Sequence, residues 1–454
     1  MHEQVFRLLD EWKDEYTAVL KKWVSVPSLK AGGHDQAPFG HELRRMLDIA
    51  MEDCRFFGLE TREYDGYCGE AILGTEKDAL AVLAHLDVVP AGDGWETQPF
   101  EPVIRDGRMY GRGTGDDKGP ALCALFAMRA IREAGIPLKR SIRLILGCDE
   151  ESGSEDIAYY KTKTVMPRIG FSPDASFPLI NTEKAMIQVR FHAPLAKEGL
   201  QVLEMRTGER VNVIPGLSTC LVEGGEDIVE AVRAWSEKTG LPATAEKTDR
   251  GVCLTTEGIP GHSAYPEGRR NAIGMMLLLL RDLGVQGPLR KLADLYGLEH
   301  DGASLGIACH DDLSGALTCN MGILHVEQGT VRATLDNRVP VKADLDRLES
   351  ILREKLSGFV VDDLHRVEPH HVPPESELVT CLLGAYHDLT GLDPIPESTG
   401  GGTYAKELEE GVAFGANFPG DPDLAHQANE YVDLDKMILT AKIYAEALLR
   451  LCAR

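Results

Sequence analysis

The sequence contains no apolar run long enough to cross a bilayer. The run Met275 to Leu280 is far shorter than the ~20 residues that a membrane-spanning helix needs, so it is typical of a buried helix segment. Charged residues also interrupt the first turns of the chain, from Glu3 and Arg7 to Glu15, and leave no signal-peptide core. We therefore expect neither a membrane partner nor export.

Cysteine pairs spaced C-x-x-C are also absent. The ten cysteines are scattered, which predicts reduced and mostly buried thiols, and thus a cytoplasmic protein. The scatter also argues against a cysteine-rich structural zinc site. Any metal would be bound by histidine and carboxylate side chains.

Positive charge is scarce. The chain has 48 Lys plus Arg against 72 Asp plus Glu, a formal charge of -24, which would repel a nucleic-acid backbone or anionic lipid. No nucleic-acid partner is expected. Many proteins are acidic for solubility alone, so this charge does not identify a substrate.

What is present fits a soluble protein of two domains. The chain has 454 residues, 43% hydrophobic and 26% charged, which is too long for one ordinary core. The spacing of Val5, Leu9, Trp12, Tyr16, Val19 and Trp23 predicts an opening helix that ends before Pro27.

Short apolar runs predict strands that are covered on both faces. Ala79 to Ala84 and Ile142 to Cys148 are such runs, and between them a helix is expected from Pro120 to Ala134, before Gly135. This strand, helix, strand order predicts a parallel or mixed sheet.

From about residue 186 the pattern changes to alternating segments, such as Met186 to Phe191 and Thr330 to Leu335. A helix at 376–390 and a buried strand at 412–416 then resume the first pattern. We interpret the middle as an inserted α+β module with an antiparallel sheet. The overall prediction is an α/β catalytic domain with a mixed, largely parallel sheet flanked by helices, plus this insertion.

The segment AHLDVVP at 84–90 follows a predicted strand. If the strand continues, His85 and Asp87 point to the same side, so that the carboxylate can orient the imidazole and leave one ring nitrogen for a metal. By itself, a His-x-Asp pair more often has a structural role.

The glycine-rich segment GRGTGDDKGP at 111–120 places Asp116 and Asp117 before a helix. It matches neither phosphate-loop pattern, G-x-x-x-x-G-K-[ST] or G-x-G-x-x-G, so a cation suits it better than a phosphate. The alternative is that Asp116 only caps the helix.

Three further segments carry candidate ligands. CDEESGS at 148–154 supplies Glu150 and Glu151, of which one could bind a metal while the other takes a proton from water, and FSPDASFP contains Asp174. His426 lies in PGDPDLAHQANEYV. Each segment alone could be an ordinary acidic turn or loop. Together, His85, Asp116, Glu151, Asp174 and His426 suit two zinc-like ions.

Six motifs in the same order resemble the PepV-like dipeptidases, within the metallopeptidase family that includes aminoacylases, carboxypeptidase G-type enzymes and succinyl-diaminopimelate desuccinylases. They are HLDVVP, GRGTGDDKGP, DEESGS, SPDASFP, GGGTYA at 400–405 and FPGDPDLAHQANE, which span nearly the whole chain.

The resemblance implies a two-metal hydrolase of dipeptides. His85 and Asp174 would bind one ion, Glu151 and His426 the other, and Asp116 both, with two Zn²⁺ expected and Mn²⁺ or Co²⁺ compatible. Asp87 would orient His85, and Glu150 would be the general base. The Asp116–Asp117 peptide bond is expected to be cis.

The resemblance also assigns residues 1–185 and 371–454 to the catalytic domain and 186–370 to a lid. In the lid, Asn212 and His262 would stabilise the oxyanion and Arg338 would bind the carboxylate of a small peptide substrate, near backbone donors at Gly401, Gly402 and Thr403. A lid of this length implies a monomer.

Two other functions remain open. An N-acyl or N-succinyl amino acid deacylase of the same family would use the same metal centre. An inactive peptide-binding relative would lack a ligand or the base, and this sequence keeps them all.

Overall fold

The computed structural model describes residues 2–454, and they form two compact units. Unit 1 comprises residues 2–181, 372–397 and 402–454, and unit 2 comprises residues 182–371 and 398–401. The expected division at 185/186 and 370/371 differs from these bounds by a few residues. The structure also groups residues 398–401, expected in the first domain, with unit 2.

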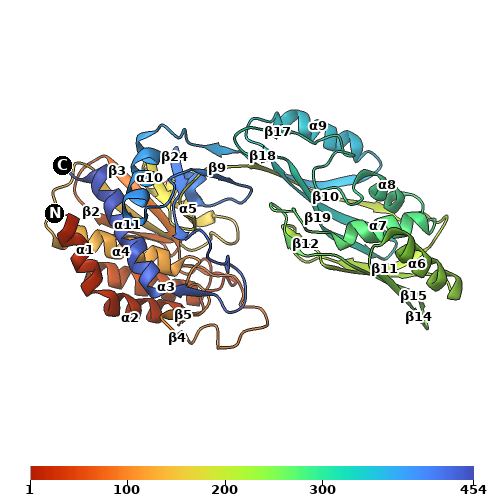
Figure 1. Ribbon diagram of the computed structural model, residues 1–454, viewed down its shortest axis with the longest axis horizontal. Coiled ribbons are helices and arrows are strands. Elements are labelled where there is room, and N and C mark those ends of the chain that lie inside the picture. The colour runs from red at the N-terminus through yellow and green to blue at the C-terminus, as the bar shows by residue number, and fades with distance from the viewer. Residues whose placement is uncertain (1) are drawn as a thin grey trace. The chain divides into compact units, whose positions relative to one another are not determined.

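Unit 1 contains a mixed sheet between helices (Figure 1). Seven of the nine strands of this sheet are, in spatial order, β1 (Glu60–Tyr64), β2 (Cys68–Leu73), β6 (Ser141–Gly147), β3 (Ala79–His85), β7 (Ile169–Ser172), β24 (Glu410–Ala413) and β9 (Ile180–Glu183), and the short strands β22 (His370–His371) and β23 (Glu397–Thr399) pair with β9. The central pairs β6–β3, β3–β7 and β7–β24 are parallel, and the outer pairs are antiparallel. The predicted fold class is confirmed.

The apolar run of β3 is buried on both faces, as its composition predicted. Leu80, Val82 and Ala84 pack into the core on one face, whereas Ala81 and Leu83 pack into the core on the other. The helices of unit 1 are α1 (His2–Glu11), α2 (Lys13–Val24), α3 (His41–Phe56), α4 (Lys118–Glu133), α5 (Glu155–Lys163), α10 (Glu377–Thr390), α11 (Leu434–Cys452) and the short 3₁₀ helix η1 (Tyr404–Glu407).

Two predicted helices differ from their expected bounds. The predicted opening helix is two helices, α1 and α2, which are separated at Trp12. Helical hydrogen bonds nevertheless continue across the division, because Trp12 N donates to Leu8 O and Tyr16 N donates to Trp12 O. Helix α4 begins at Lys118, two residues before the expected Pro120. Small strands complete unit 1: β4 (Val103–Arg105), β5 (Arg108–Tyr110), β26 (Tyr431–Asp433), β8 (Ala175–Ser176) and β25 (Ala416–Asn417).

Unit 2 contains an eight-stranded antiparallel sheet with helices (Figure 1). The strand order is β14 (Ala243–Thr248), β15 (Gly251–Glu257), β13 (Leu217–Val222), β11 (Val202–Thr207), β19 (Thr318–Glu327), β20 (Thr330–Val339), β10 (Ala185–Pro194) and β21 (Val360–Val367). Burial alternates along β10, so one face of this sheet is packed.

The remaining elements are α6 (Glu226–Thr239), α7 (Ala272–Asp282), α8 (Pro288–Leu295), α9 (Leu345–Lys355), β12 (Val213–Ile214), β16 (Gly261–His262), β17 (His310–Asp311) and β18 (Gly315–Ala316). No helix among residues 2–454 is long and apolar enough to span a membrane. All ten cysteines are free thiols.

Candidate metal centre

Three parallel strands of unit 1 end beside one another and deliver most of the candidate ligands. His85 is the last residue of β3, Glu150 and Glu151 follow β6, and Asp174 follows β7. Because the carboxyl ends of parallel strands meet at one edge of the sheet, residues far apart in sequence converge there.

Asp116 reaches the same edge from the loop that precedes α4. The peptide bond between Asp116 and Asp117 is cis, as the resemblance implied. The Asp117 carboxylate accepts a hydrogen bond from the backbone N–H of His85, with 3.1 Å between N and Oδ2. This contact joins the Asp116 loop to the end of β3, a role for Asp117 that the sequence did not predict.

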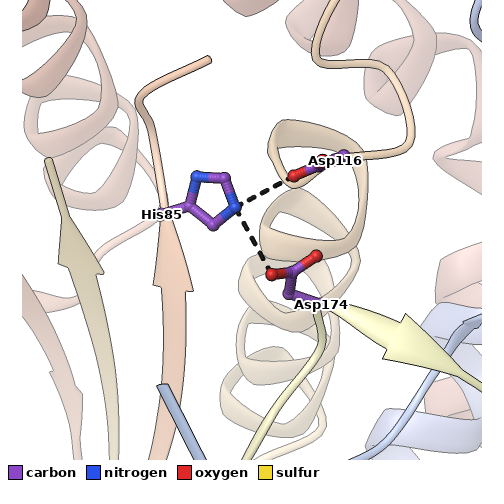
Figure 2. Close-up of side chains that lie close together, drawn as sticks. All are labelled: His85, Asp116 and Asp174. Atoms are coloured by element: carbon purple, nitrogen blue, oxygen red, sulfur yellow. Dashed lines mark ion pairs between the residues drawn. The ribbon is translucent and has the colours of Figure 1, made fainter. Parts of the chain in front are cut away.

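The first ligand group is His85, Asp116 and Asp174 (Figure 2). His85 Nε2 lies 3.0 Å from Asp116 Oδ1 and 3.6 Å from Asp174 Oδ2. Both His85 Nε2 and Asp116 Oδ1 are buried, and neither atom makes a hydrogen bond of acceptable geometry. Two close polar atoms that are not aimed at each other are typical of ligands aimed at a common cation.

The second group is Asp116, Glu151 and His426. His426 Nε2 lies 3.1 Å from Asp116 Oδ2 and 2.9 Å from Glu151 Oε1. The two oxygens of Asp116 therefore face different histidines, which is the arrangement that a carboxylate shared by two cations requires.

The backbone carbonyl of Asp87 fixes the orientation of the His85 ring. His85 Nδ1 lies 3.0 Å from Asp87 O and 3.3 Å from Asp87 Oδ1. A carbonyl oxygen only accepts hydrogen bonds, so Nδ1 carries a proton here and the Nε2 lone pair is left for a metal. The strand ends at His85, so the predicted alternation of side chains does not extend to Asp87.

The Asp87 carboxylate has a second set of contacts. Oδ1 accepts from the backbone N–H of Glu150 at 3.2 Å, and Oδ2 accepts from that of Glu151 at 3.0 Å. A single buried side chain thus connects the end of β3 with the turn that follows β6.

Electrostatics at both histidines favour positive charge. Burial lowers the pKa of His85, but contacts with Asp116 and Asp174 outweigh it, and the pKa lies well above its usual value. Burial also lowers the pKa of His426, whereas Asp116 and Glu151 raise it to about 10. Protons therefore bind where cations would bind, because the carboxylates outnumber the histidines.

The two glutamates of the turn hold protons more tightly than exposed glutamates do. Burial first and the charge of Asp174 second raise the pKa of Glu150 well above its usual range. Burial and then Asp116 raise the pKa of Glu151 to about 7. A raised pKa suits a group that accepts a proton and later returns it.

The buried carboxylate of Asp156, for which the sequence predicted no role, also holds the turn that follows β6. Asp156 Oδ2 accepts from the backbone N–H groups of Cys148 at 2.5 Å and Asp149 at 2.9 Å, and from the hydroxyl of Tyr404 at 2.5 Å. Tyr404 belongs to the GGGTYA segment. The only sequence signal for Asp156 is an acidic residue at the start of a helix, which is common.

The three lid candidates lie in unit 2 on neighbouring segments. Asn212 precedes β12, whose Val213 pairs with His262 on β16, and the backbone N–H of Ser263 donates to Asn212 O. Arg338 on β20 donates through Nε to Asp336, which also accepts from the hydroxyl of Ser263.

The GGGTYA segment is divided between the units. Gly401 belongs to unit 2, where its N–H donates to Thr399 Oγ1 at 3.0 Å. Gly402 and Thr403 belong to unit 1, where Thr403 Oγ1 accepts from the N–H of Ala405 and caps η1.

One family model and several known proteins match this chain over most of its length. The family model described as peptidase family M20/M25/M40 matches residues 81–450. A Bacillus subtilis protein named "Putative dipeptidase YtjP" is 34% identical over 426 residues, which cover 91% of this chain and 92% of that protein.

Two solved structures are similar in fold. Human carnosine dipeptidase 1 is 16% identical with a TM-score of 0.57, and the match covers 99% of each chain. The Saccharomyces cerevisiae dipeptidase Dug1p is 15% identical with a TM-score of 0.60, and the match covers 99% of this chain and 98% of that one. The chain therefore belongs to peptidase family M20/M25/M40.

Proposed function

We propose that this protein is a dinuclear metal-dependent dipeptidase that hydrolyses the amide bond of a dipeptide. The observation that carries this proposal is the pair of His and carboxylate groups that share Asp116 at the edge of the unit 1 sheet. The relative named as a dipeptidase, 34% identical to this chain, supports the choice of substrate class.

The residues present fit two divalent ions. His85 and Asp174 would bind one ion, Glu151 and His426 the other, and Asp116 would bridge them. The unsatisfied buried atoms His85 Nε2 and Asp116 Oδ1 support this assignment, because buried polar atoms rarely lack a partner. Nitrogen and oxygen ligands favour Zn²⁺ and also accept Mn²⁺ or Co²⁺.

The residues of the chain then divide the chemistry among them. When bound, the ions would polarise the scissile carbonyl and make a water molecule more acidic. Glu150 takes a proton from the attacking water as the water oxygen forms a bond to the carbonyl carbon; the C–N bond then breaks, and Glu150 returns the proton to the leaving amine. Asp87 holds Glu150 and Glu151 through their backbone N–H groups, so that the base and a ligand keep a fixed spacing.

We assign the substrate contacts to six residues, three in the lid and three in the GGGTYA segment. Asn212 and His262 stabilise the oxyanion, Arg338 binds the C-terminal carboxylate, and backbone groups at Gly401, Gly402 and Thr403 add donors. Asp336 and the carbonyl of Gly400 hold the Arg338 guanidinium, which supports a fixed role for this side chain.

A substitution of the base tests the mechanism. Glu150→Gln should lower turnover by about 10²- to 10⁴-fold, the usual contribution of a general base. Zinc content, measured by mass spectrometry, should not change. Glu155→Gln, an exposed glutamate in the next helix, is the control. Near-normal turnover of Glu150→Gln would show that another group takes the proton.

A substrate panel tests the substrate class. Xaa-His dipeptides, β-alanyl and D-aminoacyl dipeptides should be compared with N-succinyl-diaminopimelate. A dipeptidase requires a free amino terminus, so we expect cleavage of dipeptides only. Preferential cleavage of the succinylated substrate would instead identify a deacylase.

We further infer a cytoplasmic monomer. The ten free thiols support a reducing compartment. The large inserted unit supports a monomer, because shorter lids in related enzymes pair with a partner subunit. Light scattering of the purified protein should give a mass near 49.7 kDa, and twice that value would contradict the inference.

A further inference from the structure

The glycine-rich loop at 111–116 encloses an anion from its own chain. The backbone N–H of Gly113 lies 3.0 and 3.1 Å from the two carboxylate oxygens of Glu430, and that of Gly115 lies 2.8 Å from Oε1. The Asp116 N–H also points to Oε1, at 3.3 Å. Successive backbone N–H groups that converge on an anion are the device of phosphate loops. Here the anion is Glu430, which is 1% exposed.

The loop needs glycine to make this enclosure. Gly113 has φ +87°, a left-handed conformation that side chains disfavour, and a Cβ at this position would lie 2.9 Å from Val88 Cγ1. Gly113, one of the glycines that suggested a nucleotide loop, is therefore explained by its place around the internal carboxylate.

Arg112 completes the network and is also buried. Its Nη1 donates to Glu430 Oε2 at 2.8 Å, and its Nη2 donates to the carbonyl of Ala91 at 3.1 Å. Ala91 continues the segment that begins with the ligand His85, and Glu430 lies four residues after the ligand His426. The Arg112–Glu430 pair thus joins three ligand-bearing segments of unit 1.

We infer that Arg112 and Glu430 are positioning residues of the metal centre, which hold these three segments in place before metal binds. The inference rests on the proposed function, since it assumes that His85, Asp116 and His426 bind metal. Neither residue is among the candidate ligands. They keep the ligands in their converged positions, so that metal binding does not have to order these segments.

Zinc affinity tests the inference without any activity assay. Zn²⁺ binding to metal-free protein should be measured by competition with a chromophoric chelator. Glu430→Gln should weaken binding by about 10- to 100-fold, the usual effect of losing a group that supports metal ligands. Glu70→Gln is the matched control, because Glu70 is fully buried and accepts from the hydroxyls of Tyr64 and Tyr160, outside the ligand segments.

The urea unfolding midpoint of both metal-free variants should be compared first, so that a general loss of stability is separated from lost positioning. Equal zinc affinity of Glu430→Gln and wild type would overturn the inference alone. A wild-type protein that binds no zinc would instead refute the proposed metal site, and the inference would fall with it.

Hydrogen exchange of the wild-type protein decides the matter if Glu430→Gln does not fold. In metal-free protein, the amides of Gly113, Gly115 and Asp116 should exchange slowly, because Glu430 already accepts their hydrogen bonds. Exchange at the rate of an open loop, with protection only after Zn²⁺ is added, would overturn the inference.

Discussion

Asp87→Asn tests whether the Asp87 carboxylate contributes to catalysis as well as to the stability of the fold. The carboxylate accepts two backbone N–H groups, those of Glu150 and Glu151, and lies 3.3 Å from His85 Nδ1. An asparagine amide has one acceptor oxygen, so one buried N–H must face an NH₂ group in either orientation. A buried donor without an acceptor costs about 1–3 kcal/mol.

The same change should disturb the chemistry, because the displaced turn carries both the proposed base and a proposed ligand. We expect Asp87→Asn to lower kcat/KM by about 10- to 100-fold, in line with other groups that support metal ligands. Urea unfolding and steady-state kinetics on one dipeptide, with zinc in excess, measure the two effects.

Asp53→Asn is the matched control for this experiment. Asp53 is also a buried carboxylate with two donors, Trp23 Nε1 at 2.8 Å and the ammonium of Lys22, but it belongs to α3 and its donors belong to α2. It should lose comparable stability and keep kcat/KM. If Asp87→Asn lost stability but kept full kcat/KM, the assigned link between Asp87 and the catalytic turn would be refuted.

Three further changes have distinct expected outcomes. Asp116→Ala should remove both zinc ions, whereas His426→Ala should remove one, as measured by metal analysis, because only Asp116 faces both groups. In metal-free protein, the contacts of protonated His426 with Asp116 and Glu151 raise the pKa of His426 to about 10, so they stabilise the fold fully below pH 6.5 and less as the pH rises towards 10. The difference in urea midpoint between wild type and His426→Ala should therefore shrink over that range, and a constant difference would contradict this. Burial raises the pKa of Asp156 to about 7, so the effect of Tyr404→Phe, which removes a hydrogen bond to this carboxyl, should be measured above pH 8, where Asp156 is ionised. There Tyr404→Phe should cost about 1.5–3 kcal/mol in unfolding free energy, more than the ~1 kcal/mol expected for Tyr444→Phe, whose hydroxyl donates to a neutral carbonyl; equal losses would contradict a charged Asp156.

The part of the site that follows strands could be predicted from the sequence. Continuous apolar runs identified β3 and β6 as strands buried on both faces, and a connecting helix made them parallel. Parallel strands end at one edge, so His85, Glu151 and Asp174 were expected to converge. Asp116 and His426 were in the same predicted ligand set, although their loops carry no periodic signal, and the resemblance added which ion each residue would bind.

Other features had no local signal in the sequence. The division between α1 and α2 occurs at Trp12, without a proline or glycine, and the apolar stripe continues across it. The carboxylate of Glu430 meets amides more than 300 residues earlier in the chain. A pattern along the chain cannot reveal a partner at this distance in sequence. The sequence therefore did not predict that Glu430 binds the amides of the glycine-rich loop.

Repulsion among the carboxylates of the ligand cluster opposes their convergence in metal-free protein. Two like charges 4 Å apart repel by about 4 kcal/mol at the effective dielectric constant of a protein surface, and this site places several carboxylates at such distances around two histidines. Buried carboxylates outside the ligand set oppose that repulsion by binding backbone N–H groups. Asp87 and Asp156 hold the turn after β6, and Glu430 holds the loop before α4. In the proposed metal site the acidic residues of these motifs therefore have two functions, because some would bind the cations and others fix the loops that carry those ligands. Substitution of either kind should impair metal binding, but only the second kind should also release the loop amides to exchange in metal-free protein.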